Sequence, residues 1–140
     1  GGLFGGKNDT KLSQWRLIEK FTNADLIAFT SYPGLIYKHP SEIPSDYYSE
    51  VKSKMSKPIA FSELGWQTGS TIKGWESSGS EQTEFLKRFE LLRGESTYEF
   101  VIWSFLFDPK AQVPFDSMGL IDANGIEKPG LKTWQSISLN

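Results

Sequence analysis

The stretch KPIAFSELGW, residues 57–66, decides the fold. Its apolar run from Ile59 to Phe61 follows a proline, which suits the first position of a strand, and Gly65 supplies a turn signal. These residues predict a buried strand that ends at Glu63. Because parallel α/β sheets bind ligands at the carboxyl ends of their strands, Glu63 is the leading catalytic candidate.

Composition narrows the possible classes of function. The chain has 140 residues, 38% of them hydrophobic and 14% aromatic, which is enough for one globular core. A net charge of −2 argues against a nucleic-acid or anionic-membrane partner, and the apolar runs are too short to cross a bilayer. There is no cysteine, and His39 is the single histidine. Neither a metal nor another cofactor is therefore expected.

Helical and extended patterns alternate on both sides of the Glu63 strand. Long loops follow the strands and short ones return to them, which is the asymmetry of a (β/α) barrel. The last strand is almost continuously apolar, so we expect it to be covered on both faces. Three strands are too few to close a barrel. The other expected strands span 24–32 and 99–107, and the helices span 9–21, 45–55, 78–94 (with a Ser78/Glu81 capping box) and 129–137.

Four motifs, taken together, carry a family resemblance. In this order and spacing the chain resembles the C-terminal part of the clan of retaining (β/α)8 glycoside hydrolases, which includes endo-galactanases, cellulases and mannanases. The resemblance covers nearly the whole chain from about Leu12 onward. It implies an α/β fold that forms strands six to eight of a TIM barrel, with flanking helices. The motifs are SYPG (31–34), PIAFSELGW (58–66), FVIWSFLFD (100–108) and MGLIDANGIEKPGLKTW (118–134).

The resemblance also implies roles for individual residues. Glu63, at the end of strand seven, is implied to be the catalytic nucleophile, and Tyr32, at the end of strand six, to hydrogen-bond it. Trp103 on strand eight is implied to form the floor beneath the sugar. Trp66 and Trp75 lie in a polar loop, where an indole suits stacking on a sugar ring. Each residue also has a plain structural alternative: an ion-paired carboxylate for Glu63, a turn for Tyr32, and packing for the tryptophans.

One element of this clan is missing from the sequence. Retaining hydrolysis needs two carboxyl groups about 5 to 5.5 Å apart, and the clan places its acid/base on a Glu that follows an Asn. No Asn-Glu pair occurs here, and Asp108 and Asp116 lie on the wrong side of a barrel for that role. We therefore expect residues 1–140 to be a single incomplete barrel segment that lacks the N-terminal half.

The predicted function is retaining hydrolysis of a β-linked polysaccharide or oligosaccharide, incomplete without the missing half. The expected partners are the carbohydrate substrate and either that half-barrel or another copy of the chain, because open sheet edges favour pairing. The alternative is a non-catalytic carbohydrate-binding or assembly half-barrel, in which Trp66 and Trp103 stay useful and Glu63 is dispensable. By analogy alone, a polysaccharide-degrading parent enzyme is expected to be secreted.

Overall fold

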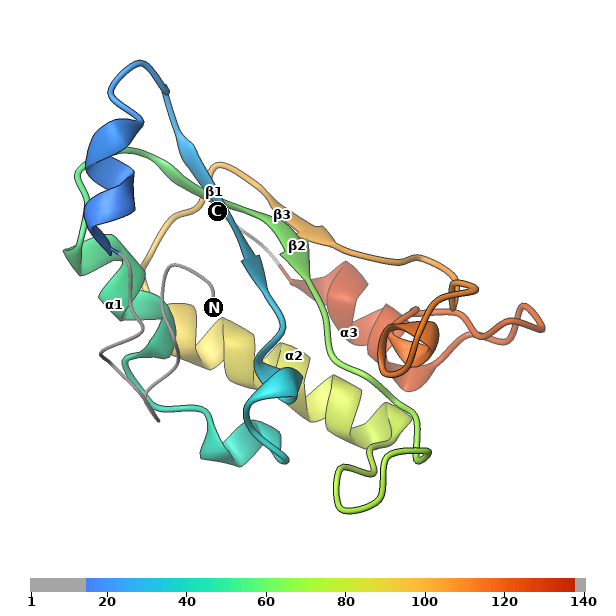
Figure 1. Cartoon of the computed structure of the whole chain (residues 1–140). Helices are drawn as coiled ribbons and strands as arrows, with labels where there is room; N and C mark the ends of the chain where they lie inside the picture. Colours follow the sequence, from blue (N-terminus) through green and yellow to red (C-terminus); the bar gives the residue numbers. More distant parts are fainter. Residues whose placement is uncertain (1–14, 138–140) are drawn as a thin grey trace.

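A computed structural model describes residues 15–137 of the chain, which fold as three parallel strands with flanking helices (Figure 1). The sheet has the order β1-β2-β3, so β2 is central and pairs with both neighbours. This arrangement confirms the predicted α/β class. The strands are β1 (Ile27–Ser31), β2 (Ile59–Leu64) and β3 (Val101–Trp103), and the α-helices are α1 (Tyr47–Ser53), α2 (Gly79–Arg93) and α3 (Pro129–Ser136).

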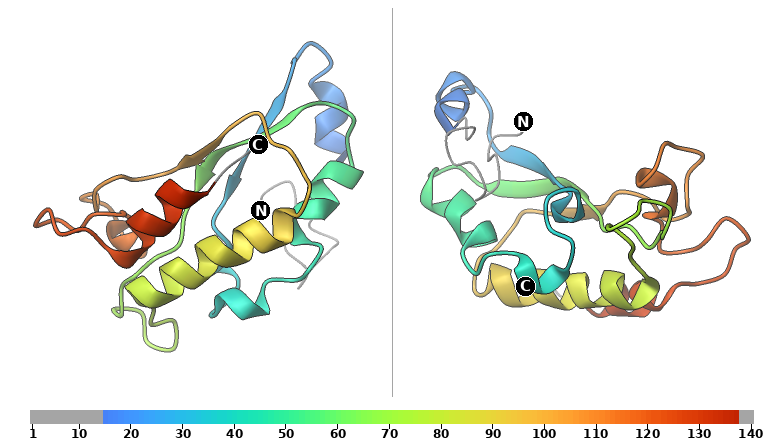
Figure 2. Two further views of the ribbon diagram at one scale, coloured as in Figure 1. Left: turned by 180° about the vertical axis from the view of Figure 1, so that it is seen from behind. Right: turned by 60° about the horizontal axis from the view of Figure 1, so that its bottom comes forward.

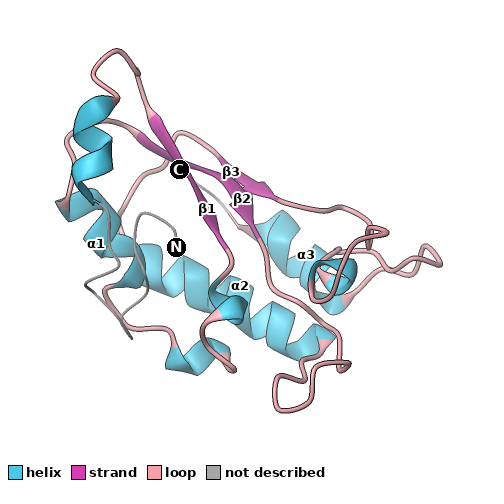
Figure 3. Ribbon diagram, in the orientation of Figure 1, coloured by secondary structure: helices cyan, strands magenta, loops and turns pink. Residues whose placement is uncertain are grey.

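The three α-helices pack on one face of the sheet (Figures 2 and 3). Phe61 of β2 lies at the centre of this layer, with its ring centroid 5.5 Å from that of Tyr48 on α1 and 6.2 Å from that of Phe89 on α2. Tyr48 and Phe89 also touch edge to face, at 4.9 Å. Aromatic rings prefer such T-shaped contacts, so this cluster fixes α1 and α2 against the sheet.

Helix α2 follows its sequence signals closely. Its buried stripe includes Phe85 and Phe89, and Gly94 ends it with a φ of +52°, as predicted. At the other end, the Ser78 hydroxyl accepts the backbone N–H of Glu81 at 3.2 Å. The Glu81 carboxylate lies 2.7 Å from His39 Nδ1, so the described contacts form half of the predicted capping box.

The opposite face of the sheet carries no helix in the described part of the chain. Ala28 and Thr30 of β1 are exposed there, and Ile102 of β3 is 50% exposed. The prediction that the last strand spans 99–107 and is covered on both faces is therefore wrong. Pairing stops at Trp103, opposite Leu64, the last residue of β2. In a closed barrel, this bare face would look inward.

The remaining elements are shorter than predicted. The first helix is a 3-10 helix over Trp15–Lys20, and its predicted beginning lies outside the described residues. The third α-helix starts at Pro129, as expected from the fixed φ of proline. In the described part of the chain, three further 3-10 helices occupy the loops, at Pro33–Leu35, Pro40–Glu42 and Phe115–Ser117. Between residues 15 and 137, no helix has the length and apolarity to span a membrane.

Candidate active site

One polar residue from the end of each strand contributes to a hydrogen-bonded group. The phenol of Tyr32, which follows β1, donates to Oε2 of Glu63 on β2 at 2.7 Å. Its oxygen also lies 2.9 Å from Oγ of Ser104, which follows β3. The hydroxyl of Ser104 also lies 3.1 Å from the carbonyl oxygen of Leu64, so the serine is held between the phenol and the end of β2. The hydrogen bond that the resemblance implies between Tyr32 and Glu63 is thus present.

A β-bulge directs Glu63 toward the bare face of the sheet. Phe29 pairs with Phe61, but the next residue of β1, Thr30, pairs with Glu63, so Ser62 is one extra residue in β2. Strict alternation from Phe61 would have turned Glu63 toward the helices. The extra residue instead places Glu63 beside the exposed Thr30. Bulges near functional sites re-aim side chains in this way.

The ring of Tyr32 is held by two residues that are not among the predicted site residues. Phe115 meets it edge to face, with ring centroids 5.2 Å apart at an interplanar angle of 89°. Gly65 lies beneath it, and a Cβ at that position would stand 2.8 Å from Cε1 of the tyrosine. Burial, followed by the hydrogen bond to Glu63, raises the pKa of Tyr32 to about 12. The phenol is therefore neutral at neutral pH and donates to the carboxylate.

Trp103 faces the helices and not the bare face. It pairs with Leu64, and its ring lies 6.2 Å from that of Phe85 on α2 and 5.8 Å from that of Trp134 on α3. Its indole N–H donates to the carbonyl of Met118 at 2.9 Å. The resemblance implied that Trp103 forms the floor beneath a sugar. This placement contradicts that role, because the indole points to the helices and successive strand residues point to opposite faces of the sheet. The next residue, Ser104, takes the position toward Tyr32.

Trp66 is also a packing residue. Its side chain is fully buried and stacks on Phe85 of α2 at 5.1 Å, and its indole N–H donates to the Ser77 hydroxyl at 3.1 Å. The indole offers no exposed surface to a sugar, so the predicted contact is not found in this fold. Trp75, in contrast, is half-buried, with Lys38 Nζ 5.2 Å from its ring centroid.

Asp108, on the loop after β3, is already engaged in an ion pair. Oδ1 of Asp108 lies 2.6 Å from Lys128 Nζ and accepts the backbone N–H of Gly119 at 2.8 Å, so this aspartate serves as a structural ion-pair partner. Within residues 15–137, the side-chain hydrogen bonds of Glu63 join it to Tyr32 alone. The same part of the chain holds no group of three acidic, histidine or cysteine side chains placed for a metal ion.

No protein-family model and no curated protein sequence matches the chain. Several solved structures, in contrast, are similar to it. Faecalibacterium prausnitzii β-glucuronidase aligns with 88% of this chain at 20% identity and a TM-score of 0.65. The GH53 catalytic domain of Ignisphaera aggregans aligns with 86% at 18% identity and a TM-score of 0.61. The family 17 β-1,3-glucanosyltransferase of Rhizomucor miehei aligns with 76% at 17% identity and a TM-score of 0.57.

The chain spans only part of each of these proteins: 24% of the glucuronidase, 41% of the GH53 domain and 42% of the glucanosyltransferase. At such low identities the similarity shows the fold alone. The three parallel strands and their flanking helices match part of the (β/α)8 barrel of glycoside hydrolases.

Proposed function

We propose that the chain is the segment of a retaining glycoside hydrolase that supplies the catalytic nucleophile, Glu63. The observation that carries this proposal is the carboxylate itself, which lies at the end of β2, beside the exposed Thr30, with the Tyr32 phenol 2.7 Å away. The phenol orients this carboxylate by donating a hydrogen bond to one of its oxygens, and a carboxylate oxygen is the nucleophile of such reactions. A rigid strand end keeps the attacking oxygen oriented.

The proposed reaction has two steps. First, one oxygen of Glu63 attacks the anomeric carbon, and the bond to the leaving oxygen breaks while a second carboxylic acid protonates that oxygen. Water then hydrolyses the glycosyl ester, with the second carboxylate as the base. We assign the second carboxyl group to the complementary half of the barrel, where the resemblance places the acid/base; Asp108 is already paired with Lys128.

We propose a β-linked polysaccharide or oligosaccharide as the substrate. Two observations favour it: the barrel fold shared with glycoside hydrolases, and the names of similar structures, which include a β-glucuronidase and a β-1,3-glucanosyltransferase. The complementary half-barrel is the proposed partner. It would cover the exposed Ala28, Thr30 and Ile102 and pair with the free edges of β1 and β3.

A fluorinated sugar that traps the glycosyl-enzyme tests the nucleophile. A panel of 2-deoxy-2-fluoro-β-glycosides with dinitrophenyl leaving groups suits the purpose, because such leaving groups depart without an acid. After incubation with the complete enzyme that carries this chain, peptide mass spectrometry should find the label on Glu63. Glu63→Gln should abolish labelling, and Asp116→Asn should retain it. A label on another residue refutes the assignment. Sugar binding that survives Glu63→Gln, with no hydrolysis by the parent, supports the non-catalytic module instead.

A further inference from the structure

A lysine joins the two rim loops that follow β2 and β3. Lys128, directly before α3, places its ammonium group 2.6 Å from Asp108 Oδ1, 2.9 Å from Thr68 Oγ1 and 3.1 Å from the carbonyl of Ser117. An ammonium group has three protons, so these three acceptors satisfy it. The side chains of Lys128 and Asp108 are only 12% and 14% exposed. The lysine is therefore enclosed by the rim and not spread over the surface.

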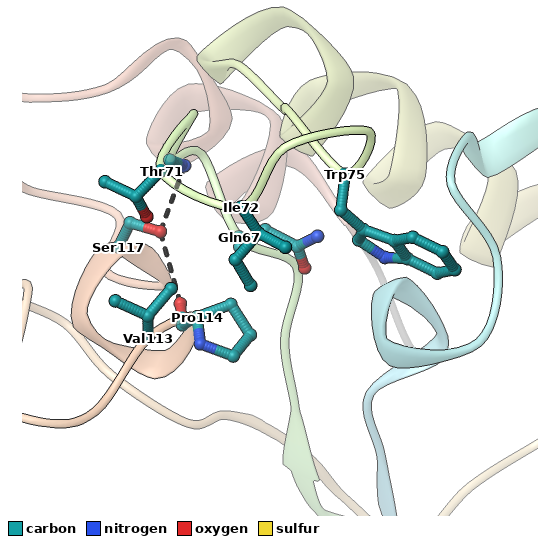
Figure 4. A pocket seen from close by; sticks show the side chains of 8 residues that line it. Gln67, Thr71, Ile72, Trp75, Val113, Pro114 and Ser117 are labelled. Carbon is teal, nitrogen blue, oxygen red and sulfur yellow. Dashed lines mark hydrogen bonds between the residues drawn. The ribbon is translucent and has the colours of Figure 1, made fainter.

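Ser117 is the point at which the two loops meet. Its carbonyl accepts the backbone N–H of Thr68 at 3.0 Å as well as the lysine proton. Its hydroxyl accepts the N–H of Gly69 at 3.0 Å and donates to the carbonyl of Pro114 at 3.2 Å (Figure 4). Thr68 Oγ1 adds a further hydrogen bond to the Ser117 carbonyl, at 2.9 Å. The 3-10 helix Phe115–Ser117 is thus tied to the β2 loop.

This short helix also carries Phe115, whose ring meets Tyr32 edge to face. We propose that Lys128 is a positioning residue: by fixing Ser117, it holds Phe115 against Tyr32 and so keeps the phenol aligned with Glu63. The catalytic meaning of this alignment rests on the proposed function. The chain of contacts itself, from Lys128 through Ser117 and Phe115 to Tyr32, does not.

The buried ion pair of Lys128 and Asp108 is better explained by positioning of the rim loops than by a gain in stability alone. Removing two charges from water costs free energy that their attraction offsets only partly, and apolar residues of similar volume often stabilise a protein equally well. The ammonium group of Lys128 holds separate segments in place, because it binds a carboxylate, a hydroxyl and a carbonyl from these segments at once. Three such bonds restrict the short helix to one place on the rim.

The test measures the surroundings of Tyr32 without substrate. Fluorotyrosine placed at position 32 gives a ¹⁹F signal that reports ring packing, and its phenol titrates at a lower pH than that of tyrosine. In the parent chain, burial by Phe115 should hold the titration midpoint above that of free fluorotyrosine. Lys128→Met should lower this midpoint by about one pH unit and shift the ¹⁹F signal toward the free value, because the ring gains water.

Arg88→Met is the matched control. It removes another long cation, whose guanidinium donates to the carbonyl of Ile43 at 2.8 Å, without touching the loops that follow β2 and β3, and should leave the ¹⁹F signal in place. A folded Lys128→Met chain with an unchanged signal overturns the proposal. If Lys128→Met fails to fold, Lys128→Gln decides: its amide has two donor protons and cannot satisfy all three acceptors, and an unchanged signal there also overturns the proposal.

The outcome is separable from that of the labelling experiment. A shifted ¹⁹F signal together with sugar label on a residue other than Glu63 supports the positioning of Tyr32 and refutes the assigned nucleophile. An unchanged ¹⁹F signal together with sugar label on Glu63 refutes the positioning role of Lys128 and supports the assigned nucleophile.

Discussion

The phenol of Tyr32 and the carboxylate of Glu63 are 31 positions apart in the chain and 2.7 Å apart in the structure. Parallel strands bring them together, since β1 and β2 both end at the same edge of the sheet. Pairing at strand ends is how α/β proteins assemble sites from distant segments. The consequences of this contact for stability and reactivity can be measured separately.

Tyr32→Phe should change the pH dependence of stability. The folded-state pKa of Tyr32 is raised to about 12 from an ordinary value of 10, so its neutral phenol favours folding below pH 10, and this contribution is lost as the pH rises from 10 to 12. At pH 8 the variant should be less stable by roughly 1 to 2 kcal/mol, from the lost hydrogen bond to a carboxylate. Urea unfolding from pH 8 to 12 should show the difference narrowing. A constant difference would contradict the raised pKa.

Gly65→Ala should disturb the ring of Tyr32 directly. The added methyl group would lie 2.8 Å from Cε1 of that ring, which is closer than carbon atoms pack. We expect a loss of about 1 to 3 kcal/mol of unfolding free energy, as for other overpacked sites. In a Tyr32→Leu background the cost should fall, because the obstructing ring is gone. Equal costs in both backgrounds, in a double-mutant cycle by urea unfolding, would show that the strain lies elsewhere.

The parts of this fold that sequence predicts well are the local ones. Three elements can each be predicted from a few neighbouring residues: the strand before Glu63 from its apolar run, α2 from the stripe of Phe85 and Phe89, and the start of α3 from Pro129. Propensity, periodicity and the fixed φ of proline act over that range. The position of Glu63 at the end of a strand followed from the same signals.

The geometry of the site depends on tertiary contacts that a short stretch of sequence does not encode. The bulge at Ser62 leaves no mark in composition, yet it decides which face Glu63 takes. The parity of β3 turns Trp103 to the helices and leaves Ser104 for Tyr32, a contact across 72 positions. Trp66 lies in a polar loop by sequence, but α2 passes close enough to bury it against Phe85. Each of these outcomes was set by tertiary packing.

Trp66 and Trp75 should therefore differ sharply when they are truncated. Trp66→Ala removes a fully buried indole that stacks on Phe85, so we expect a loss of about 3 to 5 kcal/mol of unfolding free energy. Trp75→Ala removes a half-buried ring and should cost clearly less. Urea unfolding followed by circular dichroism measures both. A larger cost for Trp75 would contradict the packing assigned to Trp66.

The bare face and the free edge of β3 should make the chain associate. Ile102 and Leu106 are 50% and 55% exposed and line the same shallow apolar groove beside β3. Burying such a patch against a second copy or a complementary half-barrel is favourable, whereas burying an unpaired charge is not. Ile102→Lys should thus weaken self-association at least about tenfold, as measured by sedimentation velocity.

Leu91→Lys supplies the matched control for this surface. Leu91 is 69% exposed, so it is at least as accessible as Ile102, but it lies on α2 and not beside the sheet edge. The same charge introduced there should leave association unchanged if contact occurs through the free edge of β3. Equal effects of the two lysines would indicate a general effect of charge on solubility. A parent chain that sediments as a monomer would show that the open edge of the sheet needs no partner.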